Sequence, residues 1–185
     1  SGCQSQYFEV WRTTDAAVTW SATFKSDSRS DTGGKAALAF ADAQRGYVSV
    51  SGRDVEPATL RTTDGGRAWS RSQVFPGPPG FRFEPSVSNL TPGAVADFGS
   101  VLLVSARAQM SGDVHRHIYR STDGGTTWSY LAPAPNDADT VFLTRTRCLQ
   151  IGNASRMGMG WISVVAVDVR HNQRTHVQTH PPQPS

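Results

Sequence analysis

The sequence predicts an all-β protein built from four-stranded antiparallel units, and three observations support this prediction. The 185 residues include 17 Gly and 11 Pro but only 18% charged residues, a composition rich in turn formers. No segment shows an apolar stripe with helical periodicity. One short motif occurs three times, each time between two strand-like runs.

The three copies of the motif are spaced as the blades of a β-propeller would be. The copies span residues 12–20, 61–69 and 120–128, and their central aspartates are Asp15, Asp64 and Asp123. Asp64 follows Asp15 by 49 residues and Asp123 follows Asp64 by 59. A propeller blade of four strands repeats every ~40–50 residues, and a closed propeller has about 4–8 blades. We therefore expect a partial β-propeller of about three to four blades.

The residue types of the motif predict a hairpin turn. Glycine pairs allow a positive φ, and an aspartate carboxylate can accept hydrogen bonds from the N–H groups of a turn. The tryptophan five residues after each aspartate is expected to fold back over its hairpin and bury apolar area. Ala16 and Ala17 replace the glycines in the first copy, so we expect that turn to be distorted or shortened. The residues assigned this structural role are Thr13, Asp15, Trp20, Thr62, Asp64, Gly66, Trp69, Ser121, Asp123, Gly125 and Trp128.

Alternating or β-branched runs predict the strands around each motif. Two complete units follow the first hairpin, and a last, partial unit has no motif of its own. Turn-rich segments at 75–80 and 132–136 connect the units. The expected strands cover residues 38–42, 46–51, 59–62 and 68–74, then 94–97, 100–105, 117–121 and 127–131, and finally 140–144 and 149–152.

The sequence divides into three parts. Residues 1–153 carry the blades, and residues 154–169 either supply a closing strand or are a stretch foreign to the repeat. Residues 170–185, rich in His, Gln and Pro, are expected to form a disordered tail. Because so few blades leave open sheet edges, the blades are expected to be stable only as an open arc, through self-association that completes the propeller, or as part of a longer parent protein.

Charge and cysteine content exclude several classes of partner. The net charge is only +3 and the 16 arginines are spread singly, which argues against nucleic-acid binding. No run reaches the ~18 apolar residues of a membrane span. The two cysteines, Cys3 and Cys148, form no metal-binding pattern. Cys3, in Ser-Gly-Cys, is either the lipidated residue of an extracytoplasmic lipoprotein or an ordinary free cysteine.

The motif resembles the Asp-box, or BNR repeat, with Ser/Thr-x-Asp-x-Gly-x-Thr-Trp matched in full at residues 121–128. Together with residues 40–50, it looks most like the photosystem II stability/assembly-factor-like propellers. This resemblance implies a propeller whose boxes are structural. It also implies an extracytoplasmic scaffold that binds a protein or a glycan without catalysis, cofactor or metal.

The same motif occurs in sialidases, which leaves a glycoside hydrolase fragment as the alternative. Sialidases use arginines against the substrate carboxylate and a tyrosine nucleophile paired with a glutamate. Arg82, Glu84 and Tyr119 are the candidate ligand contacts, but Arg82 follows the second box, whereas the equivalent sialidase arginine precedes the boxes. Arg82 and Glu84 are therefore interpreted mainly as solvated loop charges.

Overall fold

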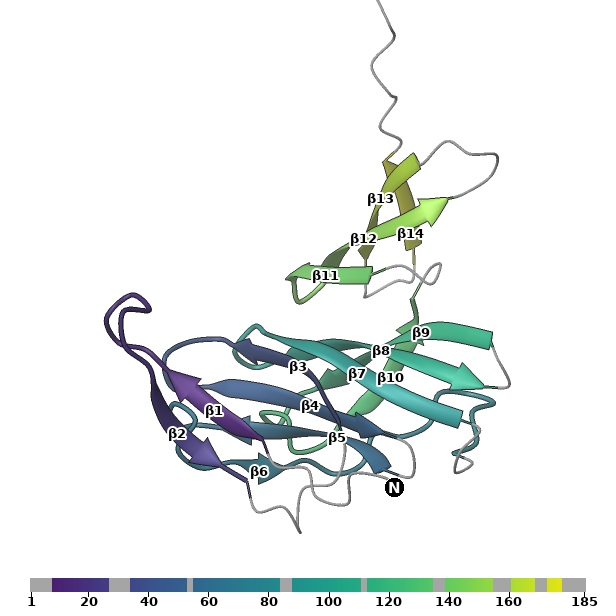
Figure 1. Ribbon diagram of the computed structural model, residues 1–185. Helices are drawn as coiled ribbons and strands as arrows, with labels where there is room; N and C mark the ends of the chain where they lie inside the picture. Colours follow the sequence, from purple (N-terminus) through teal and green to yellow (C-terminus); the bar gives the residue numbers. More distant parts are fainter. Residues whose placement is uncertain are drawn as a thin grey trace, which may run out of the picture.

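The computed structural model describes residues 8–26, 34–52, 55–83, 88–110, 113–134, 139–154, 161–168 and 173–177. These residues form a two-stranded hairpin and three four-stranded sheets, all antiparallel, and contain no helix (Figure 1). The predicted all-β class and its four-stranded antiparallel units are therefore confirmed. Among the described residues there is accordingly no helix that could cross a membrane.

The hairpin and the first sheet hold the first two copies of the motif. The first copy joins the two hairpin strands, and the second copy joins the last two strands of the sheet. The pairing between the last two strands of the sheet becomes irregular beyond Arg71. Pro57 lacks an N–H, and Thr59 N donates to the Ser72 hydroxyl instead of to a backbone carbonyl. The last strand is therefore shorter than predicted. The strands are β1 (Glu9–Arg12) and β2 (Ser21–Lys25), followed by β3 (Gly34–Phe40), β4 (Gly46–Gly52), β5 (Val55–Thr62) and β6 (Ser70–Arg71).

The second sheet repeats this order, with the third motif between its last two strands. The first and third strands are longer than predicted, and Pro92 lies in the edge strand beside a register shift, where the missing N–H costs no ladder hydrogen bond. The strands are β7 (Ser88–Asp97), β8 (Leu102–Met110), β9 (Asp113–Ser121) and β10 (Ser129–Pro133).

The last sheet has four strands, two more than the partial unit predicted. Residues 161–168 pair with β12 and form the third strand of this sheet. The fourth strand lies at residues 173–177, inside the segment whose composition predicts disorder, where it pairs with β13. The strands are β11 (Asp139–Thr144), β12 (Arg147–Ala154), β13 (Trp161–Asp168) and β14 (Gln173–Val177).

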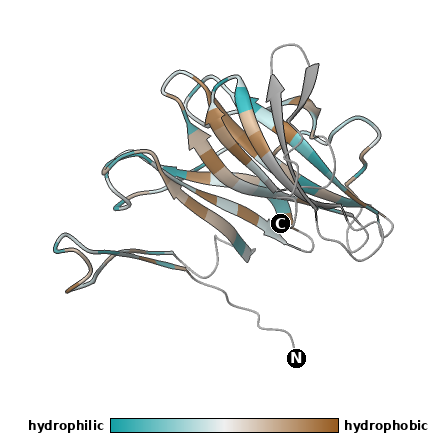
Figure 2. Cartoon of the chain, turned by 90° about the horizontal axis from the view of Figure 1, so that it is seen from above, coloured by the Kyte–Doolittle hydropathy of each residue, from teal (hydrophilic) through white to brown (hydrophobic). Residues whose placement is uncertain are grey.

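The core lies between successive sheets. Strands β4 and β8 are buried along almost their whole length, because another element covers each of their faces. Apolar residues recur along the strands of the stacked sheets (Figure 2). On one face, β4 packs against β7 and the apolar cluster beneath Trp128. On the other, Val48, Val50 and Leu60 pack with Phe8 and Trp69 on the side of the hairpin.

The three motif tryptophans are buried to very different degrees. Trp128 is 5% exposed, Trp69 is half-buried, and Trp20 is 56% exposed. The expectation that each ring covers its hairpin is therefore wrong for Trp20. Trp69 and Trp128 are enclosed by the element that precedes their own sheet, whereas the hairpin β1–β2 has no such element among the described residues.

Candidate functional site

The three aspartate motifs share one set of hydrogen bonds. In the third copy, Ser121 Oγ donates to Asp123 Oδ1 at 2.8 Å and accepts from Gly125 N at 2.9 Å. Asp123 also accepts from the backbone N–H of Thr126 and Thr127 and from the Thr127 hydroxyl. The second copy repeats the backbone bonds around Asp64. The predicted role of the aspartate as acceptor for turn N–H groups is confirmed.

The first copy keeps this arrangement despite its alanines. Ala16 and Ala17 adopt φ of 54° and 71°, close to the 75° and 90° of Gly65 and Gly66. Ala17 N donates to Thr13 Oγ1 at 2.9 Å, as Gly66 N does to Thr62 Oγ1. The expectation of a distorted or shortened turn is therefore wrong. The hydrogen bonds around Asp15 hold two alanines in a left-handed conformation that costs each roughly 1–2 kcal/mol.

These hydrogen bonds keep the aspartates ionised. The hydroxyl and backbone N–H of Thr19 and the Thr13 hydroxyl lower the pKa of Asp15 from 3.8 to about 2. The Thr127 hydroxyl and N–H lower the pKa of Asp123 well below its ordinary value. A carboxylate held in this way is a poor general acid or base near neutral pH, because that chemistry needs a pKa close to the working pH.

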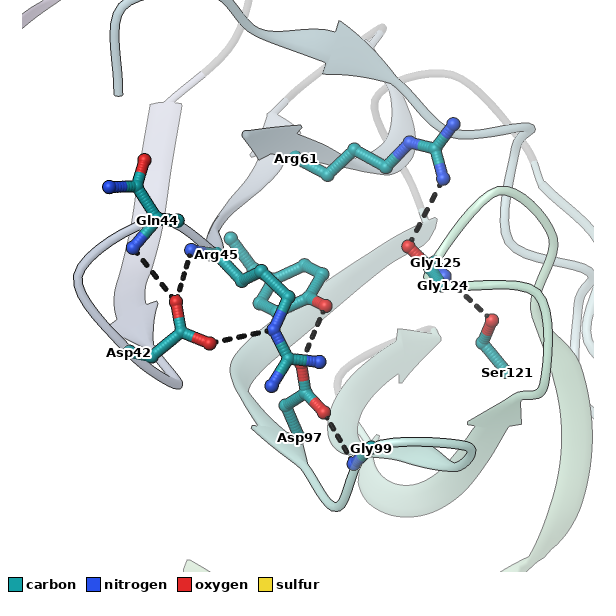
Figure 3. Close-up of polar contacts among 10 residues, drawn as sticks. Asp42, Gln44, Arg45, Arg61, Asp97, Gly99, Ser121, Gly124 and Gly125 are labelled. Carbon is teal, nitrogen blue, oxygen red and sulfur yellow. Dashed lines mark hydrogen bonds and ion pairs between the residues drawn. The ribbon is translucent and has the colours of Figure 1, made fainter. Parts of the chain in front are cut away.

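A polar network joins the first and second four-stranded sheets at the box end of the strands (Figure 3). Asp42, in the β3–β4 turn, accepts from the backbone N–H of Gln44 and Arg45 and from Arg45 Nε. Arg45 Nη1 also lies 3.2 Å from Asp97 Oδ2, whose side chain is almost fully buried. Asp97 accepts from the Tyr47 hydroxyl at 2.9 Å and from Gly99 N at 2.7 Å. Desolvation and the bond to Asp97 raise the pKa of Tyr47.

The boxes also contact one another through arginines. Arg61 Nη1 donates to the carbonyl of Gly124 at 3.2 Å, which links the second box to the third (Figure 3). The Arg12 guanidinium lies against Gly65 in the same way, so that a Cβ at Gly65 would meet Nη1 at 2.6 Å. Each of these arginines lies three residues before its own box aspartate. The hairpin is therefore placed against the first sheet as that sheet is placed against the second.

A pocket of about 400 Å³ lies between the hairpin and β3, and it is the candidate functional site. Large apolar side chains lie around it, and four of them are exposed: Trp11, Trp20, Leu38 and Phe40. Its polar wall comes from the first box and the β3–β4 turn. A mainly apolar hollow with a few polar groups suits a binding site. The lining residues are Val10, Trp11, Arg12, Thr13, Trp20, Leu38, Phe40, Asp42, Ala43 and Gly65.

The structure places neither Arg82 nor Tyr119, two of the residues of the hydrolase alternative, in the lining of this pocket. Arg82 is exposed in the connection between β6 and β7. Tyr119 is fully buried, its hydroxyl donates to the Pro76 carbonyl at 2.9 Å, and burial raises its pKa. Tyr119 therefore packs in the core, and its burial does not fit the expected ligand contact. Glu84 and Cys3 lie outside the described residues.

The sequence predicted only part of this site. Thr13 and Trp20 belong to the motif, but Trp11, Leu38 and Phe40 had no assigned role. Alternation in β3 places Leu38 and Phe40 on one face, which was the available signal. Their exposure depends on what lies above β3, and a single strand's pattern does not reveal that.

No group of three or more His, Cys, Asp or Glu side chains in the described part of the chain could hold a metal ion. No protein-family model matches the sequence, and no curated protein matches it.

Proposed function

We propose that this chain is a non-enzymatic scaffold of the Asp-box β-propeller type that acts outside the cytoplasm and binds protein through the pocket at β1 and β3. In this proposal each four-stranded sheet is one blade. The role resembles that of the photosystem II assembly-factor-like propellers.

The repeated contact between boxes supports the propeller arrangement. Arg12 lies against Gly65 as Arg61 lies against Gly124. The same arginine–glycine contact therefore occurs between the hairpin and the first sheet and between the first and second sheets. A constant step between sheets is what radial repetition requires. The hydrogen-bonded box carboxylates support a structural role for the boxes, as the resemblance implies.

The observation that carries the binding role is the exposed apolar surface around the pocket. Leu38 is 58% exposed and Phe40 43%, and both lie beside the exposed indoles of Trp11 and Trp20. Contiguous exposed apolar residues around a hollow mark interaction sites more often than isolated ones do. The large apolar side chains in this lining favour a polypeptide over a glycan, which would need more hydrogen-bonding groups.

Site-specific photo-crosslinking in the native host tests this proposal. A photoreactive residue at position 38 should give covalent adducts with another polypeptide, whereas one at Val141, exposed on β11, should not. Adducts at both positions or at neither would contradict the proposal. Cleavage of a fluorogenic sialoside that is lost in Arg82→Ala would favour the hydrolase alternative instead.

A further inference from the structure

The edge of β1 is the position in the repeat that a strand fills in the other units. The hairpin β1–β2 carries a box between its strands, as β5–β6 and β9–β10 do. In those two sheets the first box strand also pairs with a preceding strand, β4 or β8. Among the described residues, β1 pairs with β2 alone. The other edge of β1 is thus equivalent to the edge of β5 that β4 occupies.

The pocket adjoins this open edge, and the next interface shows what occupies the equivalent place. Strand register makes Leu38 equivalent to Val95, because they pair with Val48 and Val104 at matching positions in their sheets. Val95 is only 6% exposed, because β4 packs against β7. Leu38 is exposed because no described strand lies over β3 at that point.

The side chain that fills the equivalent place is Tyr47 of β4. Its ring lies against Leu102 and Gly125, and its hydroxyl donates to Asp97. At the pocket, the ring of Phe40 lies across Gly46. Gly46 is the register equivalent of Leu102 in the second sheet. Phe40 is also the register equivalent of Asp97. The pocket therefore has the apolar ring of Phe40 at the position where the second sheet has the carboxylate that accepts from Tyr47.

We infer that β1 and this pocket form a strand-addition site for an extended segment of a partner polypeptide, which inserts a large apolar side chain beside Phe40. The segment runs antiparallel to β1, as β4 runs to β5. Backbone hydrogen bonds to the open edge supply affinity, and the pocket selects the inserted side chain. A phenylalanine suits the pocket better than a tyrosine, because Phe40 stands where the second sheet offers the carboxylate of Asp97 to a tyrosine hydroxyl. The Asp42 carboxylate in the lining already accepts from the backbone N–H groups of Gln44 and Arg45 and from Arg45 Nε.

A second folded copy of this chain is a poorer source of this strand. Its own β4 is paired on both edges, with β3 and β5. Of the four described edge strands in the first two sheets, β6 has two residues, while β7 contains Pro92 and β10 ends in Pro133, and a proline cannot donate to a ladder. The remaining edge strand, β3, carries Leu38 and Phe40 of the pocket itself.

Synthetic peptides with the sequence of β4 test this inference, which rests on the proposed function. The probe is a dye-labelled peptide of residues 41–52, with Tyr, Phe or Ala at the position of Tyr47. Fluorescence anisotropy with the full chain should show the Phe peptide binding about tenfold more tightly than the Tyr peptide. The Ala peptide should bind at least about tenfold more weakly than the Phe peptide.

The variant Phe40→Asp provides the sharper readout. It restores the carboxylate found at Asp97, so it should reverse the preference and favour the Tyr peptide. Val141→Asp, a matched change at an exposed apolar residue on β11, should leave both affinities unchanged. Tryptophan fluorescence and circular dichroism establish that each variant is folded. If Phe40→Asp fails to fold, Leu38→Asp replaces it and should weaken both peptides at least about tenfold.

Three outcomes would overturn the inference. They are absence of binding by the Phe peptide, a preference that Phe40→Asp does not change, and a stable dimer in light scattering that the peptide does not displace. The proposed function fails separately, when position 38 gives no adduct with any polypeptide in the host. An adduct at position 38 without any peptide binding would leave the scaffold role standing and remove only strand addition.

Discussion

The two faces of the first four-stranded sheet meet their neighbours through the same motif but with different results. On one face, Trp128 of the second sheet is buried, stacks on Phe75 at 4.9 Å and donates from Nε1 to Thr59 Oγ1. On the other, the equivalent Trp69 contacts the hairpin, stays half-buried and donates to the carbonyl of Gly66 in its own turn.

The neighbouring strand explains this difference. Thr59 and Val10 occupy the same position in their units, five residues before the box aspartate. Thr59 offers an acceptor to the indole of Trp128, whereas Val10 offers none to Trp69. The hairpin also covers less of the sheet than a four-stranded neighbour does, which leaves Leu38 and Phe40 exposed. The motif thus determines the conformation of the turn. The unit that precedes it determines how deeply the motif tryptophan is buried, and therefore how much this side chain stabilises the fold.

Replacing the tryptophans should give the largest and most graded effect. Trp128→Ala should lower the free energy of unfolding by about 3–5 kcal/mol, because it empties a buried and well-packed site. Trp69→Ala should cost less, and Trp20→Ala about 0.5 kcal/mol or less, as for exposed positions. Urea unfolding followed by circular dichroism measures the series. Equal losses at Trp20 and Trp128 would contradict the difference in burial.

Exchanging the residue beneath the tryptophan should give a smaller effect. Thr59→Val removes the acceptor of Trp128 Nε1–H and should cost about 1–3 kcal/mol, since a buried donor loses its partner. The reciprocal change, Val10→Thr, should not stabilise the chain, because Trp69 already has an acceptor in Gly66 and the new hydroxyl would be buried. The same urea titrations compare the two. A Thr59→Val variant as stable as the parent chain would show that this hydrogen bond does not distinguish the two faces.

Restoring the glycines of the first box should stabilise the chain slightly. Ala16→Gly and Ala17→Gly relieve the cost of positive φ, partly offset by the greater freedom of glycine in the unfolded chain, for a net gain of about 0.5–1 kcal/mol each. The matched control is Gly124→Ala in the third box, whose φ is 68° and which should lose a similar amount. Thermal unfolding detects both, and a loss of stability in Ala17→Gly would argue against strain at this turn.

The smallest expected effect concerns the pH dependence of the free energy of unfolding and is confined to acid. Asp15 has a pKa of about 2 in the folded chain, below its ordinary 3.8. Its contribution is therefore present above about pH 4 and is lost as the pH falls towards 2. Asp15→Asn should flatten the loss of stability between pH 4 and pH 2, as acid titrations followed by circular dichroism would show. Identical acid profiles for the parent chain and Asp15→Asn would contradict the hydrogen bonds around Asp15.

Local patterns allowed the strands and box turns to be predicted from the sequence. Alternation and turn residues located β4, β5, β8 and β12 to within a few residues, because both are encoded over a short stretch. The strand at residues 173–177 was missed, because a polar, His/Gln-rich composition is typical of a disordered tail. The strand forms through backbone pairing with β13, which the composition does not reveal. The Asp97–Tyr47 bond was not predictable, because it joins residues 50 apart across two sheets.

The pocket illustrates the same limit. Thr13 and Trp20 were marked by the motif, but the exposure of Phe40 depends on the packing above β3. The burial of Tyr119 could not be predicted either, because its place in a strand does not show that Phe75 and Trp128 pack in the same cluster. Burial between units is a property of the assembled sheets, and a single sequence encodes it only indirectly.

The alanines at the first turn bear on how such repeats can change over time. Asp15, Thr13 and Thr19 maintain the turn without its glycines, so the hydroxyl and carboxylate positions define a functional copy more closely than the Gly pair does. A search that demands Gly-Gly would overlook copies of this kind and undercount the repeats. Glycine can therefore be lost from one copy at a modest energetic cost while the architecture persists.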